Sequence, residues 1–438
     1  MKYKELINEL YKRRTKGIKL GLNRVIEALK RVGNPHQYFK SIHIAGTNGK
    51  GSVCKIVYCL LRAHGCSVGV FTSPHLTRFT ERIVVNDSEI LEDEVVHLIE
   101  KIKPFSDELT FFEYVTVMAF EYFRQKGIDY AVIETGMGGR LDATNVVIPV
   151  VSVITKIGLD HQEFLGPDLV SISREKAGII KERVPVVSSS QEKEAEEVII
   201  KKAEETKAPL FIYGRDFCGK LNSIKFEGIL FDFYPSKTHH SEEELNSDTY
   251  SNLFLPLTGF HQLENVCVAL KAFMTAYPSW KEDLIREGLK NVTLPGRIEI
   301  VSYDPLVIFD IAHNPDAAKS LVKSLKALTD KKPIVVFAIM KDKDVTEFIK
   351  AFEGYAHKFI FTVPKYERAL TYEELSKKMS NKKFEFIHNS FEAFKNAFYM
   401  CKKNQETYLL CTGSSYLIGE IKEHLGEKTL YRSLGEIL

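Results

Sequence analysis

The chain has 438 residues, 44% of them hydrophobic and 27% charged, and this composition excludes a mainly disordered protein. Lys and Arg number 60 against 58 Asp and Glu, and the resulting net charge of +2 argues against a dedicated nucleic-acid binder. It still leaves room for one basic pocket. The first residues do not resemble a secretory signal, and no apolar run approaches the ~20 residues of a membrane span, so we expect a cytoplasmic protein without a membrane partner.

The first elements form a βαβ unit. Residues 1–40 carry apolar side chains at helical spacing and end at Gly33-Asn34-Pro35, which is typical of a helix stop. A β-branched run at 41–45 predicts a strand, a glycine-rich turn follows, and helical spacing resumes at 53–63 before a strand at 68–72. Strand, turn, helix and strand in this order imply a parallel sheet.

The alternation continues along the chain. The patterns predict helices at 110–126, 169–180, 191–206 and 261–276, and strands at 130–134, 150–155 and 184–188. Between residues 210 and 257 the alternation of strands and helices gives way to short strands separated by turn residues. His239 and His240 fall in this part, where an exposed loop is the expected reading and a metal site a minor alternative.

Pro295-Gly296 interrupts the chain, and a second alternation follows. Strands are expected at 306–310, 334–339, 358–363 and 408–412, and helices at 316–328, 345–352 and the end of the chain. We therefore predict an α/β protein of two domains. Residues 1–294 would hold a P-loop-type, doubly wound, mostly parallel sheet, and residues 295–438 a smaller Rossmann-like domain. No coiled coil or repeat is readable, which favours a monomer.

The seven cysteines are an odd number and include no C-x-x-C pair. Most lie in apolar stretches, so we expect reduced, buried thiols. A disulfide framework and a zinc site are both disfavoured.

The turn after the first strand has the composition of a phosphate-binding loop. It reads Gly46-Thr47-Asn48-Gly49-Lys50-Gly51-Ser52. Backbone N–H groups and the helix N-terminus would cradle phosphate, Lys50 would reach the β- and γ-phosphates, and the Ser52 hydroxyl would bind Mg²⁺. The spacing departs from the usual pattern, because Ile44 replaces its first glycine and Gly51 separates the lysine from the serine. An ordinary glycine turn with an exposed lysine is the alternative.

This loop, from His43 to Val53, resembles the nucleotide loop of the folylpolyglutamate synthase/dihydrofolate synthase family, which belongs to the wider Mur ligase group. Further family motifs follow in the same order: Thr72-Ser73-Pro74-His75-Leu76, Glu81-Arg82-Ile83, Phe111-Phe112-Glu113, Gly138-Gly139-Arg140-Leu141-Asp142-Ala143-Thr144-Asn145, Leu159-Asp160-His161, Glu175-Lys176-Ala177-Gly178-Ile179, Gly259-x-His261-Gln262, Pro295-Gly296-Arg297, Ala312-His313-Asn314-Pro315 and Lys341-Asp342-Lys343-Asp344. The match runs from about residue 40 to 420.

The resemblance implies an ATP-dependent carboxylate–amine ligase. ATP would convert a folate or pteroate carboxylate to an acyl phosphate, which the amine of L-glutamate would attack. A Mur-type ligase acting on a peptidoglycan precursor and a silent nucleotide-binding module are the alternatives. Residues typical of catalysis argue against the silent module: Lys50, Glu134, His161 and Lys176.

Five residues are expected at two magnesium sites. Glu134 ends a strand at the carboxyl edge of the sheet, where ligands bind in open α/β folds. The resemblance makes it a Mg²⁺ ligand together with Ser52 and Ser73, and makes His161 a ligand of a second ion. It also implies that Lys176 is carbamylated, so that an anion replaces a cation beside the metal. Taken singly, these residues would read as a structural glutamate, a loop histidine and a surface lysine.

The resemblance also assigns the substrates. Asn265, Arg297 and Asp310 would contact the nucleotide. His313 and Ser414 would shape the glutamate site, with His313 the candidate general base and a helix N-cap pair with Asp310 its alternative reading. The folate or pteroate would contact four residues: Arg82, Phe111, Phe112 and Asp142. For the phenylalanines, core packing is the alternative.

Three departures from the family pattern concern the acceptor details rather than the ATP chemistry. Ile311 stands where the family usually has Gly, Ser415 replaces a usual Leu, and Pro167-Asp168 replaces a segment with Thr. Whether the first glutamate, later ones or both are added stays open.

Overall fold

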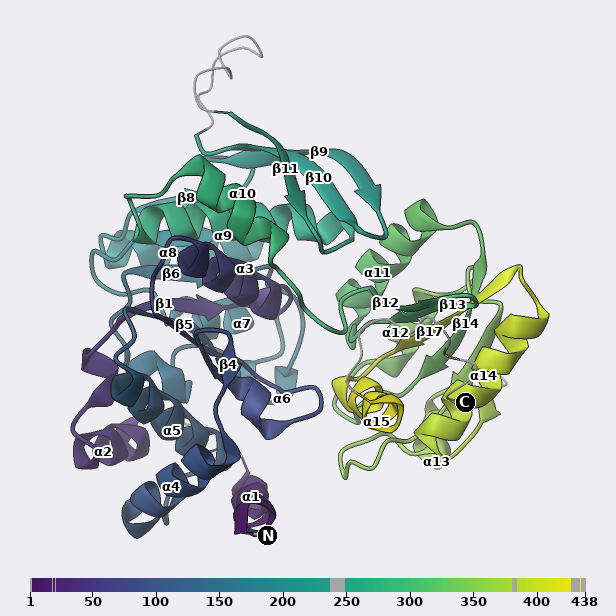
Figure 1. Ribbon diagram of the computed structural model, residues 1–438, viewed down its shortest axis with the longest axis horizontal. Coiled ribbons are helices and arrows are strands. Elements are labelled where there is room, and N and C mark those ends of the chain that lie inside the picture. Colours follow the sequence, from purple (N-terminus) through teal and green to yellow (C-terminus); the bar gives the residue numbers. More distant parts are fainter. Residues whose placement is uncertain are drawn as a thin grey trace. The chain divides into compact units, whose positions relative to one another are not determined.

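The structure is a computed structural model and describes residues 2–17, 19, 21–236, 249–379, 384–426 and 434. His239 and His240 lie outside the described residues. The chain divides into two compact units (Figure 1). Unit 1 comprises Met1–Lys220, Phe231–Phe254 and Leu263–Val292, and unit 2 comprises Leu221–Leu230, Leu255–Gln262 and Thr293–Leu438. The domain boundary at 294/295 stays a prediction, and two short segments before it group with unit 2.

Unit 1 is built on an eight-stranded sheet in the order β4-β3-β2-β5-β1-β6-β7-β8. Its strands are β1 (Lys40–Ala45), β2 (Val68–Phe71), β3 (Ile83–Val85), β4 (Ser88–Glu89), β5 (Tyr130–Glu134), β6 (Val151–Ile154), β7 (Val186–Ser188) and β8 (Leu210–Ile212). The strands from β2 to β8 along this order pair in parallel, and β3 and β4 add an antiparallel edge. The parallel strands are almost wholly buried, as strands covered on both faces must be.

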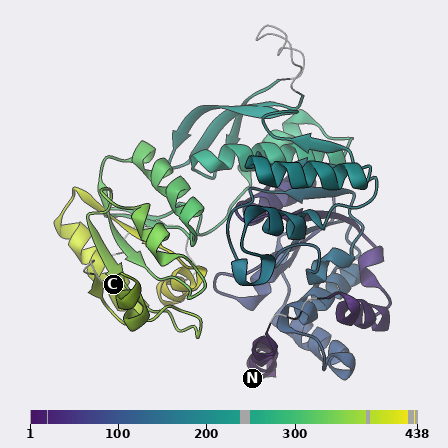
Figure 2. The same ribbon diagram turned by 180° about the vertical axis from the view of Figure 1, so that it is seen from behind.

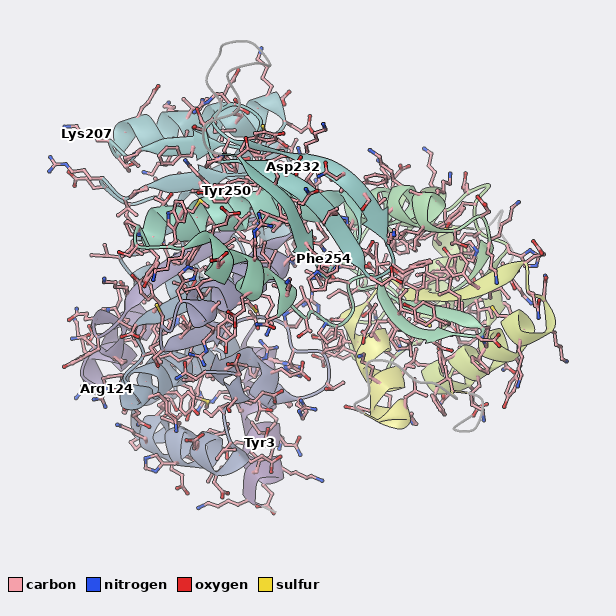
Figure 3. The ribbon with its side chains drawn as sticks, turned by 45° about the horizontal axis from the view of Figure 1, so that its top comes forward. Tyr3, Arg124, Lys207, Asp232, Tyr250 and Phe254 are labelled. Atoms are coloured by element: carbon pink, nitrogen blue, oxygen red, sulfur yellow. The ribbon has the colours of Figure 1, made fainter. Side chains whose placement is uncertain are left out.

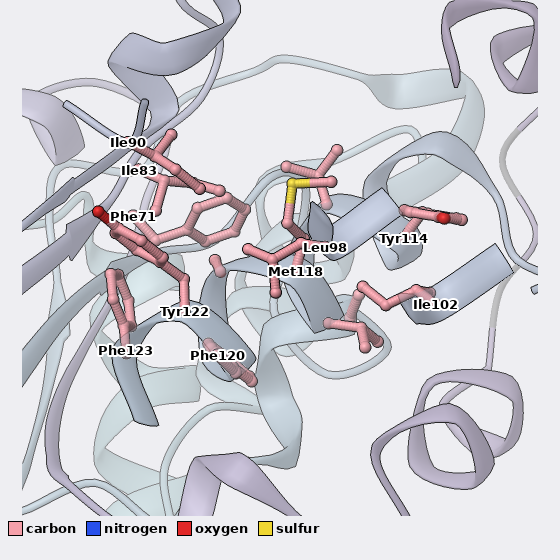
Figure 4. Close-up of a cluster of buried hydrophobic side chains, with 14 of the residues drawn as sticks. Phe71, Ile83, Ile90, Leu98, Ile102, Tyr114, Met118, Phe120, Tyr122 and Phe123 are labelled. Carbon is pink, nitrogen blue, oxygen red and sulfur yellow. The ribbon is translucent and has the colours of Figure 1, made fainter. Parts of the chain in front are cut away.

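Helices cover both sides of this sheet (Figure 1; Figure 2). They are α1 (Lys2–Lys12), α2 (Asn23–Arg31), α3 (Lys50–Ala63), α4 (Glu92–Ile102), α5 (Phe111–Lys126), α6 (Gln162–Leu165), α7 (Leu169–Ala177), α8 (Lys193–Glu205), α9 (Phe260–Ala276) and α10 (Glu282–Lys290). One core cluster joins α4 and α5 to β2 and β5 (Figure 4). A second joins α7 and α8 to β6 and β7. The doubly wound α/β prediction is therefore confirmed.

A three-stranded sheet stands where the sequence predicts short strands. It consists of β9 (Cys218–Lys225), β10 (Gly228–Tyr234) and β11 (Tyr250–Leu255), in the order β11-β10-β9. Figure 3 labels Asp232, Tyr250 and Phe254 on it. The Asp232 carboxylate accepts the N–H of Asn252 at 2.7 Å, and this bond links β10 to β11.

Unit 2 has a six-stranded sheet in the order β12-β13-β17-β14-β15-β16. Its elements are β12 (Glu299–Tyr303), β13 (Leu306–Phe309), α11 (Pro315–Leu328), β14 (Lys332–Phe337), α12 (Val345–Lys350), β15 (Lys358–Phe361), α13 (Tyr372–Lys378), β16 (Glu385–Phe386), α14 (Ser390–Lys403), β17 (Thr407–Thr412) and α15 (Ser415–Leu425). All pairs are parallel except β12 with β13. The parallel order with intervening helices matches the predicted Rossmann-like class.

All seven cysteines are free in the structure and six of them are buried, as expected from the apolar stretches in which most of them lie. None of the helices in the described part of the chain is long and apolar enough to cross a membrane.

Candidate active site

The loop between β1 and α3 can be built only with glycine at two positions. Gly46 has φ +148° and Gly49 has φ +93°. A Cβ on Gly46 would lie 1.9 Å from Thr155 Oγ1, and one on Gly49 would lie 2.4 Å from Asn265 Oδ1. The fold therefore places Asn265 against Gly49 of the loop, although 216 positions separate the two residues in the chain. Since α3 begins at Lys50, the amides of its first turn lack intrahelical acceptors, and such amides are suited to bind an anion.

The start of the loop is fastened to the end of β6. The carbonyl of Lys156 accepts the N–H groups of Thr47 and Asn48 at 3.0 and 3.1 Å. The Thr47 hydroxyl and the backbone of Gly158 exchange two hydrogen bonds of 3.1 Å. These two amides are therefore occupied by protein, and an incoming phosphate would meet the first turn of α3 instead.

Two lysines converge on one carbonyl of this loop. Lys50 Nζ donates to the carbonyl oxygens of Gly46 and Thr47 at 3.1 and 3.2 Å. Lys176, on α7, is buried and its Nζ donates to the same Gly46 oxygen at 2.8 Å. The predicted catalytic lysines thus lie together, although 126 positions separate them in the chain.

A buried carboxylate lies beside the loop. Glu134 pairs in register with Ile44 of β1, and its Oε2 accepts the N–H of Ser73 at 3.1 Å. Burial raises the pKa of the nearby Cys54 thiol, the Glu134 charge raises it further and the Lys50 charge lowers it, so both charges are close. The Ser52 hydroxyl is buried at the start of α3.

This donor set suits Mg²⁺, which prefers oxygen ligands and is held by one or two carboxylates together with phosphate. Glu134, Ser52 and Ser73 supply such oxygens. The described residues contain no group of three or more His, Cys, Asp or Glu that could hold a metal alone, so phosphate oxygens would complete the shell. His161 has φ +52° before α6, and its Nε2 lies 3.9 Å from Asp160 Oδ2.

The two phenylalanines have different surroundings. Phe111 belongs to the core cluster of α4 and α5, and its ring centroid is 5.5 Å from that of Tyr11. Phe112 is only partly buried, stacks on Phe71 at 5.7 Å and lies against Gly136. Phe111 is therefore buried in the core, whereas Phe112 packs against the same cluster and keeps part of its surface exposed.

Arg82 is buried beside an uncharged histidine. Its Nε donates to His75 Nδ1 at 2.8 Å, and its Cζ lies 5.4 Å from the Phe111 ring. Burial lowers the pKa of His75 to about 3, aided by Arg82 and Arg14. His75 therefore accepts without adding charge. From the sequence, His75 belongs to a motif but has no assigned role, because nothing around it in the chain indicates that it pairs with Arg82.

Asp142 is engaged within its own loop. Its carboxylate accepts the N–H of Thr144 at 3.0 Å and that of Met137 at 2.9 Å, and also accepts the Thr144 hydroxyl. Burial raises the pKa of this carboxyl group, and these hydrogen bonds oppose the rise. The predicted contact of Asp142 with a pterin stays a prediction.

In unit 2, two carboxylates fasten the turn that carries Arg297. Asp310 accepts the N–H groups of Ile298 and Ala312 at 2.9 and 2.8 Å. Burial raises the pKa of Asp310, while the positive charge of Arg297 lowers it. Glu299 accepts the N–H of Gly296 at 2.8 Å and pairs with Lys422 of α15 at 2.6 Å. Sequence reasoning missed this largely buried ion pair, because its partners are 123 positions apart.

His313 and Ser414 occupy loops at the carboxyl ends of neighbouring strands. His313 Nδ1 donates to the carbonyl of Ile311 at 2.9 Å. Asn314, rather than the pair considered above, caps α11 by accepting the N–H of Ala317. Ser414 caps α15 by accepting the N–H of Tyr416 at 3.1 Å. The candidate residues of unit 2 therefore gather at one sheet edge.

Three histidines, the buried His43 and the partly buried His75 and His261, should make the stability of the fold depend on pH. Burial lowers the pKa of His43 and His75 to about 3 and that of His261 to about 4. An unfolded histidine has a pKa of about 6.5, so the unfolded chain binds more protons between these values. The free energy of unfolding should therefore fall as pH drops below about 6.5, by up to about 1.4 kcal/mol per pH unit for each histidine.

Urea unfolding at about pH 7, 6 and 5 measures this slope, and His261→Gln should reduce it. A free energy of unfolding that stays constant over this range would contradict the expectation.

Two domain families match the chain. The Mur ligase middle domain matches residues 44–273, and the Mur ligase, glutamate ligase domain matches residues 296–415. The chain therefore belongs to the Mur ligase family.

Relatives define the family more closely. The dihydrofolate synthase/folylpolyglutamate synthase of Bacillus subtilis is 34% identical over 431 residues, covering 93% of this chain and 96% of that protein. The folylpolyglutamate synthase of Mycobacterium tuberculosis complexed with ADP has a TM-score of 0.89 at 30% identity, covering 98% of this chain and 99% of that one. FolC of Escherichia coli in complex with DHPP and ADP has a TM-score of 0.85 at 33% identity, covering 96% and 97%. The chain belongs to the folylpolyglutamate synthase/dihydrofolate synthase family.

Proposed function

We propose that this protein is an ATP-dependent ligase that joins L-glutamate to a folate, to dihydropteroate, or to both. ATP phosphorylates the acceptor carboxylate, the amine of glutamate attacks the acyl phosphate, and ADP and phosphate leave. Similarity along nearly the whole chain to synthases solved with ADP supports this proposal. The observation that carries it is the glycine loop on which Lys50 and Lys176 converge.

In this proposal the nucleotide binds along the loop Gly46–Ser52. The amides of the first turn of α3 receive phosphate, and Lys50 leaves its carbonyl partners to neutralise the transferred group. Asn265 contacts the nucleotide from its position against Gly49. Arg297 and Asp310 would also contact the nucleotide.

Two magnesium ions would be held by different residues. Glu134, Ser52 and Ser73 would hold the first, which neutralises phosphate charge when bound. His161 and a carbamylated Lys176 would hold the second. The acceptor would contact Arg82, Phe111, Phe112 and Asp142, and glutamate would contact His313 and Ser414. We further propose a monomer that acts in the cytoplasm, which light scattering after gel filtration would test for its oligomeric state.

The test is ADP release with Mg-ATP and L-glutamate in the presence of dihydropteroate or tetrahydrofolate. Release with either acceptor supports the proposal, and the comparison of the two decides between first and later glutamates. Release only with a peptidoglycan precursor would indicate the Mur-type alternative. ATP binding without release with any acceptor would indicate a silent module.

Gly49→Ala should weaken ATP binding. At φ +93° a Cβ costs about 1–2 kcal/mol, and here it would also displace Asn265. We expect the KM for ATP to rise on the order of tenfold to a hundredfold, as misplaced contacts of this kind do.

Gly65→Ala is a matched control at the end of the same helix. Gly65 has φ +80° and nothing lies within 4 Å of its Cβ position. Alanine there would therefore be strained in its backbone but would clash with no neighbour. Equal KM values for ATP in both variants would contradict a role for the close approach.

A further inference from the structure

A chain of hydrogen bonds joins β1 to the turn that follows β5. His43 is fully buried in β1, and its Nε2 lies 2.8 Å from the Thr144 hydroxyl. That hydroxyl donates to Asp142, whose other oxygen accepts the N–H of Met137 at 2.9 Å. We call His43, Thr144 and Asp142 the relay, and residues 136–139 the glycine turn.

The relay fixes the state of the histidine. The Thr144 hydroxyl has one hydrogen and gives it to Asp142, so it can only accept from His43. His43 therefore carries its proton on Nε2. Its Nδ1 is left as a buried acceptor without a hydrogen-bond partner among the described residues. Burial lowers the pKa of His43 to about 3, so the ring stays neutral. An apolar residue would avoid the unpaired nitrogen, which points to a role beyond packing.

The glycine turn contacts two residues of the candidate site. A Cβ on Gly136 would lie 2.6 Å from Cζ of Phe112. A Cβ on Gly139 would lie 2.8 Å from the backbone oxygen of Lys176. A shift of this turn would therefore move the partly exposed Phe112 ring on one side. On the other side it would move the backbone of Lys176, whose side chain contacts the loop.

We propose that His43 and Thr144 are positioning residues that act through Asp142 to hold the glycine turn against Phe112, and thereby determine how tightly the aromatic acceptor binds. The inference rests on the proposed function, because it assigns the acceptor to Phe112. It differs from a direct role of Asp142, since neither His43 nor Thr144 touches the acceptor in this scheme.

Steady-state kinetics of Thr144→Val and Thr144→Ser test the proposal. Valine keeps the volume and removes the hydroxyl, while serine keeps the hydroxyl. We expect the acceptor KM to rise about tenfold to a hundredfold in Thr144→Val, the range for a lost hydrogen bond to a charged group, and to stay near wild type in Thr144→Ser. The KM for ATP should change less than about twofold in both. An unchanged acceptor KM in Thr144→Val, or equal loss in both variants, would overturn the proposal.

Nitrogen NMR of protein with labelled histidine tests the hydrogen-bond pattern of the relay without measuring turnover. It therefore applies even if Thr144→Val does not fold. His43 should be neutral and protonated on Nε2 from about pH 5.5 to 8. A proton on Nδ1 would overturn the relay. If the wild-type protein shows this signal but releases no ADP with any acceptor, the proposed function fails while the relay stands. His43→Leu, which leaves Asp142 intact, should raise the acceptor KM as Thr144→Val does.

Discussion

Lys50→Ala is expected to lower kcat by about 10²–10³-fold, the loss typical when one group that stabilises transition-state charge is removed. The transferred phosphoryl group spreads negative charge over its oxygens, and this lysine is the cation that α3 places at its own N-terminus. The fold should survive. Lys50 is partly exposed, its two hydrogen bonds go to carbonyls of its own loop, and alanine is a good helix former. We expect about 1 kcal/mol of lost stability.

Measured kcat, together with thermal unfolding, separates activity from folding. Lys55→Ala is the matched control, because Lys55 is on the same helix and its Nζ lies 5.0 Å from the Tyr58 ring rather than on the loop. Ligation at the wild-type rate by a folded Lys50→Ala protein would remove the loop from the mechanism.

Lys176→Ala should lose activity about 10²-fold or more and regain part of it with formate or acetate. A carbamate forms when the uncharged amine attacks CO₂ and loses a proton, and it converts a buried cation into an anion able to bind metal. A small acid can fill the space that alanine leaves and restore the negative charge. As the ammonium, Lys176 instead donates to Gly46 and fastens the loop.

Lys176→Arg separates these two roles. Arginine keeps a permanent positive charge and cannot form the carbamate, so it should be as inactive as alanine. Activity within about twofold of wild type in Lys176→Arg, or no rescue of Lys176→Ala by acids, would support the ammonium role and exclude the carbamate. Lys181→Ala is the control for rescue, because Lys181 donates to the carbonyl of Asn145 instead of the loop.

Long periodic segments were predictable, and edge elements were not. The strands at 41–45 and 130–134 and the helix at 110–126 agree with β1, β5 and α5 within one residue. The two strands are continuous buried, mostly apolar runs and the helix is a long one, so these segments stand out in the sequence. The antiparallel strands β3, β4 and β12 were not assigned. β3 and β4 have only three and two residues, which is too few for a readable pattern. Helix α14 also escaped the periodicity reading.

The sequence by itself determined the family, the α/β class and the phosphate loop, because motif order and hydrophobic period are properties of the chain alone. Only the tertiary structure decided which of these residues meet. It brings Lys176 to the Gly46 carbonyl, Asn265 to Gly49 and His43 to Thr144. It also buries Phe111 in the core, whereas Phe112 beside it stays partly exposed. Such contacts depend on strand register and helix packing, which join residues that are distant in the chain and leave no local pattern.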